Sequence, residues 1–209
     1  MIKTILFDMG GVVITLDQRQ AIERFKSLGL ADAEQRLDAY TQQGIFGDLE
    51  AGKITDEDFR RELSVLVGRE LSWNECRYAW MGYCGGVPER NLQKMNELRD
   101  RGYRVVLLSN TNPYMMSWVM SDEFDGKGHS LGYYLDEAYM SYKCGAMKPD
   151  PVFFNAVIKG EALVPEETLF LDDGPRNIAA ADALGIKTLL VDNGEDWTGK
   201  IEEKLKALS

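Results

Sequence analysis

The sequence is poor in histidine and cysteine, with one and three of these residues among 209. With His129 alone, a histidine-rich zinc site cannot be built, and a Ser-His-Asp triad would have to use that residue. Because His129 lies in a polar, glycine-rich stretch, residues 125–130, we expect it to be a solvated loop residue. Cys76, Cys84 and Cys144 form no CxxC pair, which favours reduced thiols and a cytoplasmic protein. Any catalysis is therefore expected to use carboxylates, lysine and hydroxyl groups.

The sequence also lacks an excess of basic residues and a long uncharged run. Its 24 basic and 34 acidic residues give a net charge of −10, which argues against nucleic acid or an anionic membrane surface as a partner. Asp8 interrupts the N-terminal apolar run too early for a signal peptide, and the longest uncharged stretch, residues 105–121, contains Asn110, Asn112 and Pro113. We therefore predict no membrane span. The Rossmann glycine fingerprint and the GxxxxGK[ST] loop are absent as well.

The sequence does contain a short apolar run near its start that is followed directly by Asp8. Residues 5–7 predict a buried strand, and Asp8, Gly10 and Gly11 follow it. In a parallel sheet the carboxyl ends of the strands face the binding crevice, so Asp8 is expected at its floor. The glycines would allow a sharp turn and leave backbone groups close to a ligand. A strand-end aspartate alone is often a turn or helix-cap residue, but the same pattern recurs twice further along the chain.

Residues 17–85 predict helices without an intervening strand. Apolar residues, among them Tyr40, recur at helical spacing in 17–28 and 31–43, and helix N-terminal patterns begin at Thr55 and Ser72. We interpret residues 16–85 as an all-helical cap that is inserted after the first strand.

Two features of this predicted cap have alternative readings. The glycine-punctuated segment 44–53 is predicted to be a loop, which either overhangs the crevice and selects the substrate or merely joins two helices. Trp73, Trp80 and Tyr83 fall near one face of the last cap helix. They either pack the cap against the core or form a wall of a substrate pocket.

From residue 86 onwards the pattern alternates between helix and strand, which predicts a parallel α/β sheet. We therefore expect a Rossmann-like, doubly wound α/β core built from residues 1–15 and 86–209. In the helix expected at 113–120, Met115, Met116 and Met120 are predicted to fill the core. The other expected helices are 88–101, 151–159, 175–184 and 198–208, the strands are 103–108, 138–142, 168–171 and 186–191, and residues 121–135 are expected to be a polar loop.

Three of the predicted strands end in polar residues, at positions 8, 109–110 and 172–173, and Lys148 lies in a loop just before a helix. At one end of one sheet these residues would gather carboxylates, a hydroxyl, an amide and an ammonium group. Crowded carboxylates repel one another, and Mg²⁺, which takes one or two carboxylates plus a phosphate oxygen, would relieve that repulsion. The lysine and the hydroxyl would then bind a phosphoryl group, which a free carboxylate could attack.

Four segments of this constellation resemble, in order and spacing, motifs one to four of the haloacid dehalogenase-like (HAD) hydrolases. They read FDMGGV at residues 7–12, LSNT at 108–111, KPD at 148–150 and LDDG at 171–174. The helical insertion lies where that superfamily carries its C1 cap. Within the superfamily the chain most resembles small sugar-phosphate phosphatases of the glucose-1-phosphate phosphatase type, which have a similar Asp-x-Gly opening and Lys-Pro pair.

This resemblance implies a Mg²⁺-dependent phosphatase that hydrolyses a small phosphorylated metabolite through an aspartyl-phosphate intermediate. Asp8 would be the nucleophile, and Lys148 would neutralise charge on it and in the transition state. Asp172 would neighbour the metal site, and Asn177 would orient the region around Asp173. The implied catalytic residues are Asp8, Lys148 and Ser109, the phosphoryl-binding residues are Gly11, Ser109, Asn110 and Lys148, and the metal ligands are Asp8, the backbone carbonyl of Gly10, and Asp173.

One departure from the family pattern concerns Gly10. Most phosphatases of the superfamily carry a second aspartate there, which protonates the leaving group and then activates water. Such assistance typically contributes about 10²- to 10⁴-fold to the rate. A less basic leaving group would need the acid less, which favours a sugar 1-phosphate as substrate.

Other members of the superfamily provide alternative hypotheses. A 2-haloacid dehalogenase also lacks the second aspartate, but it uses no metal and would leave the carboxylates at 172–173 without a role. A HAD-like domain that has lost turnover would instead bind a phosphorylated ligand or partner, which the missing acid at Gly10 allows. A phosphonatase would need a cap lysine, for which Lys53 is the candidate. The identity of the substrate, the group that activates water and the oligomeric state are left open. Whether Asp172 or Asp173 binds the metal directly is left open as well.

Overall fold

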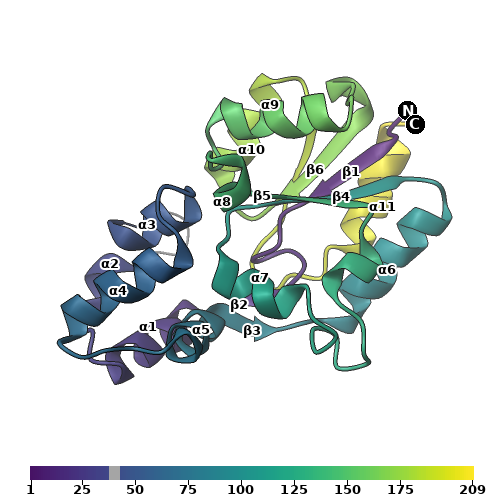
Figure 1. Cartoon of the computed structure of the whole chain (residues 1–209). Coiled ribbons are helices and arrows are strands. Elements are labelled where there is room, and N and C mark those ends of the chain that lie inside the picture. The colour runs from purple at the N-terminus through teal and green to yellow at the C-terminus, as the bar shows by residue number, and fades with distance from the viewer. Residues whose placement is uncertain (38–42) are drawn as a thin grey trace.

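A five-stranded parallel sheet forms the centre of the molecule. The computed structural model describes residues 1–37 and 43–209 (Figure 1). The strand order is β5-β4-β1-β6-β7, so the chain starts in the middle, builds one edge and then returns to build the other. This is the doubly wound α/β arrangement that the sequence predicts. The strands are β1 (Thr4–Phe7), β4 (Arg104–Ser109), β5 (Glu137–Met140), β6 (Thr168–Asp172) and β7 (Lys187–Leu190).

Alternating side chains of the central strand enter two separate hydrophobic cores. Ile5 and Phe7 pack on one face of the sheet and Leu6 packs on the other, because successive residues of a strand point in opposite directions. Helices α6 (Glu89–Asp100) and α11 (Thr198–Ala207) cover the first face, and α9 (Pro151–Gly160) and α10 (Pro175–Ala183) cover the second (Figure 1). With both faces buried, the strands read as continuous apolar runs in the sequence.

A group of helices stands beside the sheet, at the left of Figure 1. Their shared core contains Phe25, Phe46, Phe59 and Trp80, whose ring centroids lie 5.2–5.7 Å apart in five pairs. Capping boxes at Thr55 and Ser72 begin two of these helices, at the positions that the sequence predicts. The helices are α1 (Gln18–Ser27), α2 (Ala33–Arg36), α3 (Ile45–Glu50), α4 (Asp56–Val67) and α5 (Trp73–Trp80).

Two predictions for this helical group are wrong. Of the helix expected at 31–43, the described residues form only α2, which ends before the extended Leu37. The rest of that prediction, with Tyr40, lies outside the described residues, except for residue 43. The segment predicted to be a loop, 44–53, contains helix α3. Gly44 and Gly52 flank that helix with φ angles of +57° and +68°, so these two glycines mark its ends rather than an irregular loop.

A short antiparallel ribbon joins the helical group to the sheet. It pairs β2 (Thr15–Leu16) with β3 (Cys84–Gly86), which follows the 3₁₀ turn η1 (Met81–Tyr83). The sequence does not predict this ribbon, because two- and three-residue strands show no recognisable alternation. The remaining elements are α7 (Pro113–Val119), η2 (Leu131–Tyr134), α8 (Ser141–Cys144) and η3 (Pro165–Glu167).

The helical group packs against helix α7 of the core. The hydroxyl of Tyr114 donates a 2.6 Å hydrogen bond to the carbonyl oxygen of Asp56, and the Tyr114 ring lies 5.1 Å from that of Trp73. Further along, a Cβ on Gly52 would overlap the backbone carbonyl of Tyr142 in α8. The C-terminal end of α3 is thereby held against the edge of the sheet where the strands end.

One prediction outside the site needs correction. Met115 and Met116 are buried, but Met120 is 37% exposed and does not fill the core. His129 is a loop residue, as predicted, and its side chain is 40% exposed. Its Nδ1 lies 2.8 Å from a carboxylate oxygen of Asp125, and its ring stacks on Tyr133. Among residues 1–37 and 43–209, no helix combines the length and the apolar character that crossing a membrane requires.

Candidate active site

Three carboxylates meet where the central strands of the sheet end. Asp8 follows β1, Asp172 ends β6, and Asp173 comes next in the chain. One oxygen from each lies within 4.8 Å of the others. The prediction that residues far apart in the sequence converge at this edge is therefore confirmed for these side chains.

Lys148 lies among these carboxylates and is 3% exposed. Its Nζ is 2.8 Å from Asp8 Oδ1 and 2.6 Å from Asp172 Oδ2. Burial alone would lower the pKa of Lys148, but Asp172 and Asp8 raise it above its ordinary value. The side chain of Asn110 fixes the lysine's backbone, because its Nδ2 donates to the Lys148 carbonyl (2.9 Å) and its Oδ1 accepts from the Lys148 N–H (2.8 Å). The Asn110 side chain and Lys148 are thereby fixed relative to each other.

The two neighbouring aspartates have different surroundings. Asp172 accepts hydrogen bonds from the Gly174 N–H (2.6 Å) and from Asn177 Nδ2 (2.9 Å), in addition to its contact with Lys148. Asn177 therefore orients Asp172, the neighbour of Asp173, rather than Asp173 itself. Asp173 Oδ2 is buried and has no hydrogen-bond partner among the described residues. Burial, and then the charge of Asp172, raises the pKa of Asp173 to about 6.

The charge balance at this edge is negative. Burial raises the pKa of Asp8 well above its ordinary value, and Asp172 and Asp173 add to this rise, although Lys148 opposes it. One ammonium group therefore faces three carboxylates that burial keeps from water. A divalent cation bound by oxygen would restore the balance, and the unpartnered oxygen of Asp173 is a suitable ligand for it. The residues present fit a magnesium ion.

The loop after β1 is rigidly attached to the core. Gly11 has a φ of +77°, and a Cβ there would overlap the Asp173 carboxylate, so only glycine allows this close approach. The carbonyl oxygen of Val12 accepts hydrogen bonds from Asn91 Nδ2 and from Trp197 Nε1, each 2.8 Å long. The turn thereby brings Gly10 and Asp8 to the same cavity.

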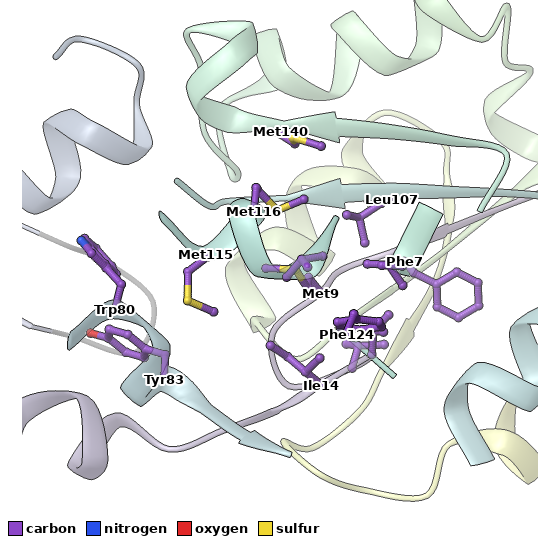
Figure 2. Packing of buried hydrophobic residues seen from close by; sticks show 14 of the residues in the cluster. Phe7, Met9, Ile14, Trp80, Tyr83, Leu107, Met115, Met116, Phe124 and Met140 are labelled. Carbon is purple, nitrogen blue, oxygen red and sulfur yellow. The ribbon is translucent and has the colours of Figure 1, made fainter. Parts of the chain in front are cut away.

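This cavity has a volume of about 90 Å³ and lies between the sheet edge and the helical group. Figure 2 shows Trp80 and Tyr83 on the side of the helical group, with Met115 next to them and Met9 toward the sheet. Of the residues predicted to form the site, those that line the cavity are Asp8, Gly10, Asn110, Lys148 and Asp173.

Two predicted site residues lie behind the cavity wall rather than in it. Ser109 is 1% exposed, and its hydroxyl is 3.3 Å from the Asn110 carbonyl oxygen, to which it donates. Gly11 contacts the Asp173 carboxylate but is not among the lining residues. The roles assigned to both remain predictions.

The helical group also contributes side chains to the cavity. Trp80 and Tyr83 line the cavity, as the pocket-wall alternative requires, whereas Trp73 packs on α7 and donates to Asp56. Glu50, the last residue of α3, also lines the cavity and was not predicted to do so. In the sequence, Glu50 is indicated only by its position in the segment 44–53, because one of the two alternatives for that segment places it over the crevice.

Comparisons with known proteins agree on one family. The model for haloacid dehalogenase-like hydrolases matches residues 2–185. A D-ribitol-5-phosphate phosphatase from Bacteroides thetaiotaomicron is 47% identical over 197 residues, which cover 94% of this chain and 95% of that protein.

Solved structures of similar proteins share the whole fold. A HAD-like family hydrolase from Porphyromonas gingivalis superposes with a TM-score of 0.94 at 41% identity and covers 99% of this chain and 98% of its own. A HAD-family enzyme from Bacteroides thetaiotaomicron, solved with magnesium and inorganic phosphate, gives a TM-score of 0.86 at 34% identity, with coverage of 96% and 99%.

Proposed function

The chain belongs to the haloacid dehalogenase-like hydrolases, and we propose that it is a magnesium-dependent phosphatase that releases phosphate from a small sugar or polyol phosphate. One observation carries this proposal. The carboxylates of Asp8, Asp172 and Asp173 converge within 4.8 Å beside the buried ammonium group of Lys148, at the floor of a cavity. Such a site suits an anionic ligand only when a cation is bound with it.

Asp8, the backbone carbonyl of Gly10 and Asp173 would hold the magnesium ion. When bound, the ion supplies positive charge that polarises the phosphoryl group and balances the carboxylates. Asp172 is excluded from this set because its oxygens already accept from Lys148, Gly174 and Asn177. The solved relative that contains magnesium and inorganic phosphate supports the assignment of this metal.

The reaction we propose begins with attack by Asp8. Its carboxylate oxygen forms a bond to phosphorus and the ester oxygen leaves with the bonding electrons, which gives an aspartyl-phosphate that water then hydrolyses. Lys148 holds Asp8 in place and offsets charge on the transferring group. Ser109, Asn110 and Gly11 would bind the phosphoryl oxygens; for Ser109 this requires the hydroxyl to turn away from the Asn110 carbonyl.

We propose a polyhydroxylated alcohol as the leaving group. The relative that is 47% identical acts on D-ribitol 5-phosphate, and this favours a pentitol phosphate. Trp80 lines the cavity, and its buried indole N–H has no hydrogen-bond partner within the described chain, so a substrate hydroxyl could accept from it. A sugar 1-phosphate is the second candidate, because its less basic leaving group would need less acid assistance at Gly10.

A screen of phosphate esters tests this proposal. The purified protein is expected to release phosphate from D-ribitol 5-phosphate or a hexose 1-phosphate in the presence of Mg²⁺, and to stop in excess chelator. Beryllium fluoride with Mg²⁺, which mimics the phosphorylated aspartate, should raise the melting temperature of the wild type but not of Asp8→Asn. Binding without turnover of any ester would indicate a ligand-binding domain, and chelator-resistant halide release from 2-chloropropionate would indicate a dehalogenase.

We also propose the domain boundaries expected from the sequence, a core of residues 1–15 and 86–209 and a cap of residues 16–85. The position of the ribbon β2–β3, where the chain leaves the sheet and returns to it, supports these boundaries. A cytoplasmic location is proposed on the basis of the three unpaired cysteines, Cys76, Cys84 and Cys144.

A further inference from the structure

The proposed phosphatase lacks an evident proton donor for the leaving group, because Gly10 has no side chain. Among the cavity-lining residues of the described chain, the ionisable ones are Asp8, Glu50, Tyr83, Lys148 and Asp173. Asp8 and Asp173 have the proposed nucleophilic and metal roles, Lys148 is paired with two carboxylates, and a phenol is a weak acid at neutral pH. Glu50 is the remaining group.

We propose that Glu50 is the general acid and general base of the reaction. This inference rests on the proposed phosphatase function and completes it. In the first step the ester oxygen takes a proton from the Glu50 carboxyl group as its bond to phosphorus breaks, and the alcohol leaves. In the second step the Glu50 carboxylate takes a proton from the attacking water, the bond between Asp8 and phosphorus breaks, and phosphate is released. Glu50 ends the cycle protonated, as it began.

The position of Glu50 suits this role. As the last residue of α3 it lines the cavity from the helical group, whereas Asp8 and Asp173 line it from the sheet edge. The packing of Gly52 against Tyr142 holds the end of α3 in place. Asn112 lies near this carboxyl group: its Oδ1 accepts from the Met115 N–H at 3.1 Å, and its buried amide nitrogen has no hydrogen-bond partner among the described residues.

Glu50 does not have the surroundings of a structural carboxylate. It is 9% exposed, and no ion pair to it occurs within residues 1–37 and 43–209. A buried carboxylate without a cationic partner is costly, so its presence in a cavity wall calls for a function. Burial raises its pKa to about 7, although the nearby Asn112 amide opposes this, and a group of that pKa can both give and take a proton near neutral pH.

The test measures kcat/KM for phenyl phosphates that differ only in the electron-withdrawing power of the ring substituent, together with D-ribitol 5-phosphate. Phenyl phosphates carry no hydroxyl for recognition, and kcat/KM reports only the steps up to phosphoenzyme formation. For Glu50→Gln we expect a loss of about 10²- to 10⁴-fold on the poorest leaving groups and little loss on p-nitrophenyl phosphate, so the dependence on leaving-group pKa becomes steeper. Glu62→Gln, an exposed glutamate of α4, is the matched control and should behave as the wild type.

Three outcomes would overturn the inference. An equal loss on every ester would indicate a structural role for Glu50, and a loss confined to the ribitol ester would indicate recognition of substrate hydroxyls. An unchanged dependence on leaving group would exclude the acid role outright. If Glu50→Gln does not fold, Glu50→Asp is measured instead. Its shorter carboxylic acid should keep the dependence of kcat/KM on leaving-group pKa shallow, with values of kcat/KM lower than those of the wild type. A wild type inactive on all esters would refute the proposed function itself.

Discussion

Replacing Glu50 with glutamine is expected to stabilise the protein at neutral and alkaline pH while it damages catalysis. The carboxyl group is buried, and its pKa is raised from 4.5 to about 7 in the folded state. The folded protein therefore holds this proton more tightly than the unfolded chain does. The resulting stability is fully present below pH 4.5 and is lost as the pH rises through about 7. Glutamine has nearly the same shape and never ionises, so its stability lacks this dependence.

The size of the effect follows from the shift in pKa. Each pKa unit corresponds to about 1.4 kcal/mol, so the difference in unfolding free energy between Glu50→Gln and the wild type should be near zero at about pH 4 and rise to about 3 kcal/mol in favour of the variant by about pH 8. Asp8, Lys148 and Asp173 share the cavity and titrate as well. They are present in both proteins, so their contributions cancel in the difference to first approximation.

Urea denaturation of both proteins at a series of pH values, with chelator present throughout, measures this difference. Glu62→Gln, whose glutamate is exposed, should show no comparable trend. A free-energy difference that stays constant from acid to alkaline pH would show that Glu50 titrates normally in the folded state. The proposed acid–base role would then lose its support from the environment of this side chain.

Three further substitutions probe the floor of the site. Asp8→Asn should reduce Mg²⁺-dependent phosphate release by roughly 10³-fold or more, measured with p-nitrophenyl phosphate, and residual activity near that of the wild type would exclude Asp8 as nucleophile. Lys148→Ala leaves the buried carboxylate of Asp172 without its cation and should lower the unfolding free energy by about 3–5 kcal/mol; urea denaturation that matches the wild type would contradict this pairing. Gly11→Ala forces a Cβ into the Asp173 carboxylate at a positive φ, so the Mg²⁺ concentration for half-maximal activity should rise at least several-fold, and an unchanged value would show that the loop can relax.

The strands and their terminal residues could be predicted from the sequence, because both depend on local order. An apolar run followed at once by a polar residue marks β1 and β6, and the rule that parallel strands end at one edge brings Asp8 and Asp173 together without further information. Lys148 is harder to predict, since it comes from a loop. Its place depends on the reciprocal hydrogen bonds with Asn110, which only the folded chain shows.

Of the cavity residues that the helical group supplies, Glu50 could not be predicted, for a physical reason. Glu50 is one acidic residue among several near glycines, and its burial in the cavity wall is evident only in the folded chain. Glycines in a sequence favour a loop, yet Gly44 and Gly52 stand at the two ends of α3. In the same way, the partner of Asn177 is Asp172 and not Asp173, a distinction that depends on the turn geometry after β6.

The ribbon formed by β2 and β3 contains both chain connections between the helical group and the sheet. Both covalent crossings lie side by side there, so a rotation about this pair would tilt the helices without stretching any strand of the core. Such a tilt would have to break the hydrogen bond from Tyr114 to Asp56, and it would carry Glu50, Trp80 and Tyr83 together. Opening the cavity to admit substrate would then also withdraw Glu50, the proposed proton donor. The cavity could be open to substrate or ready for catalysis, but not both at once.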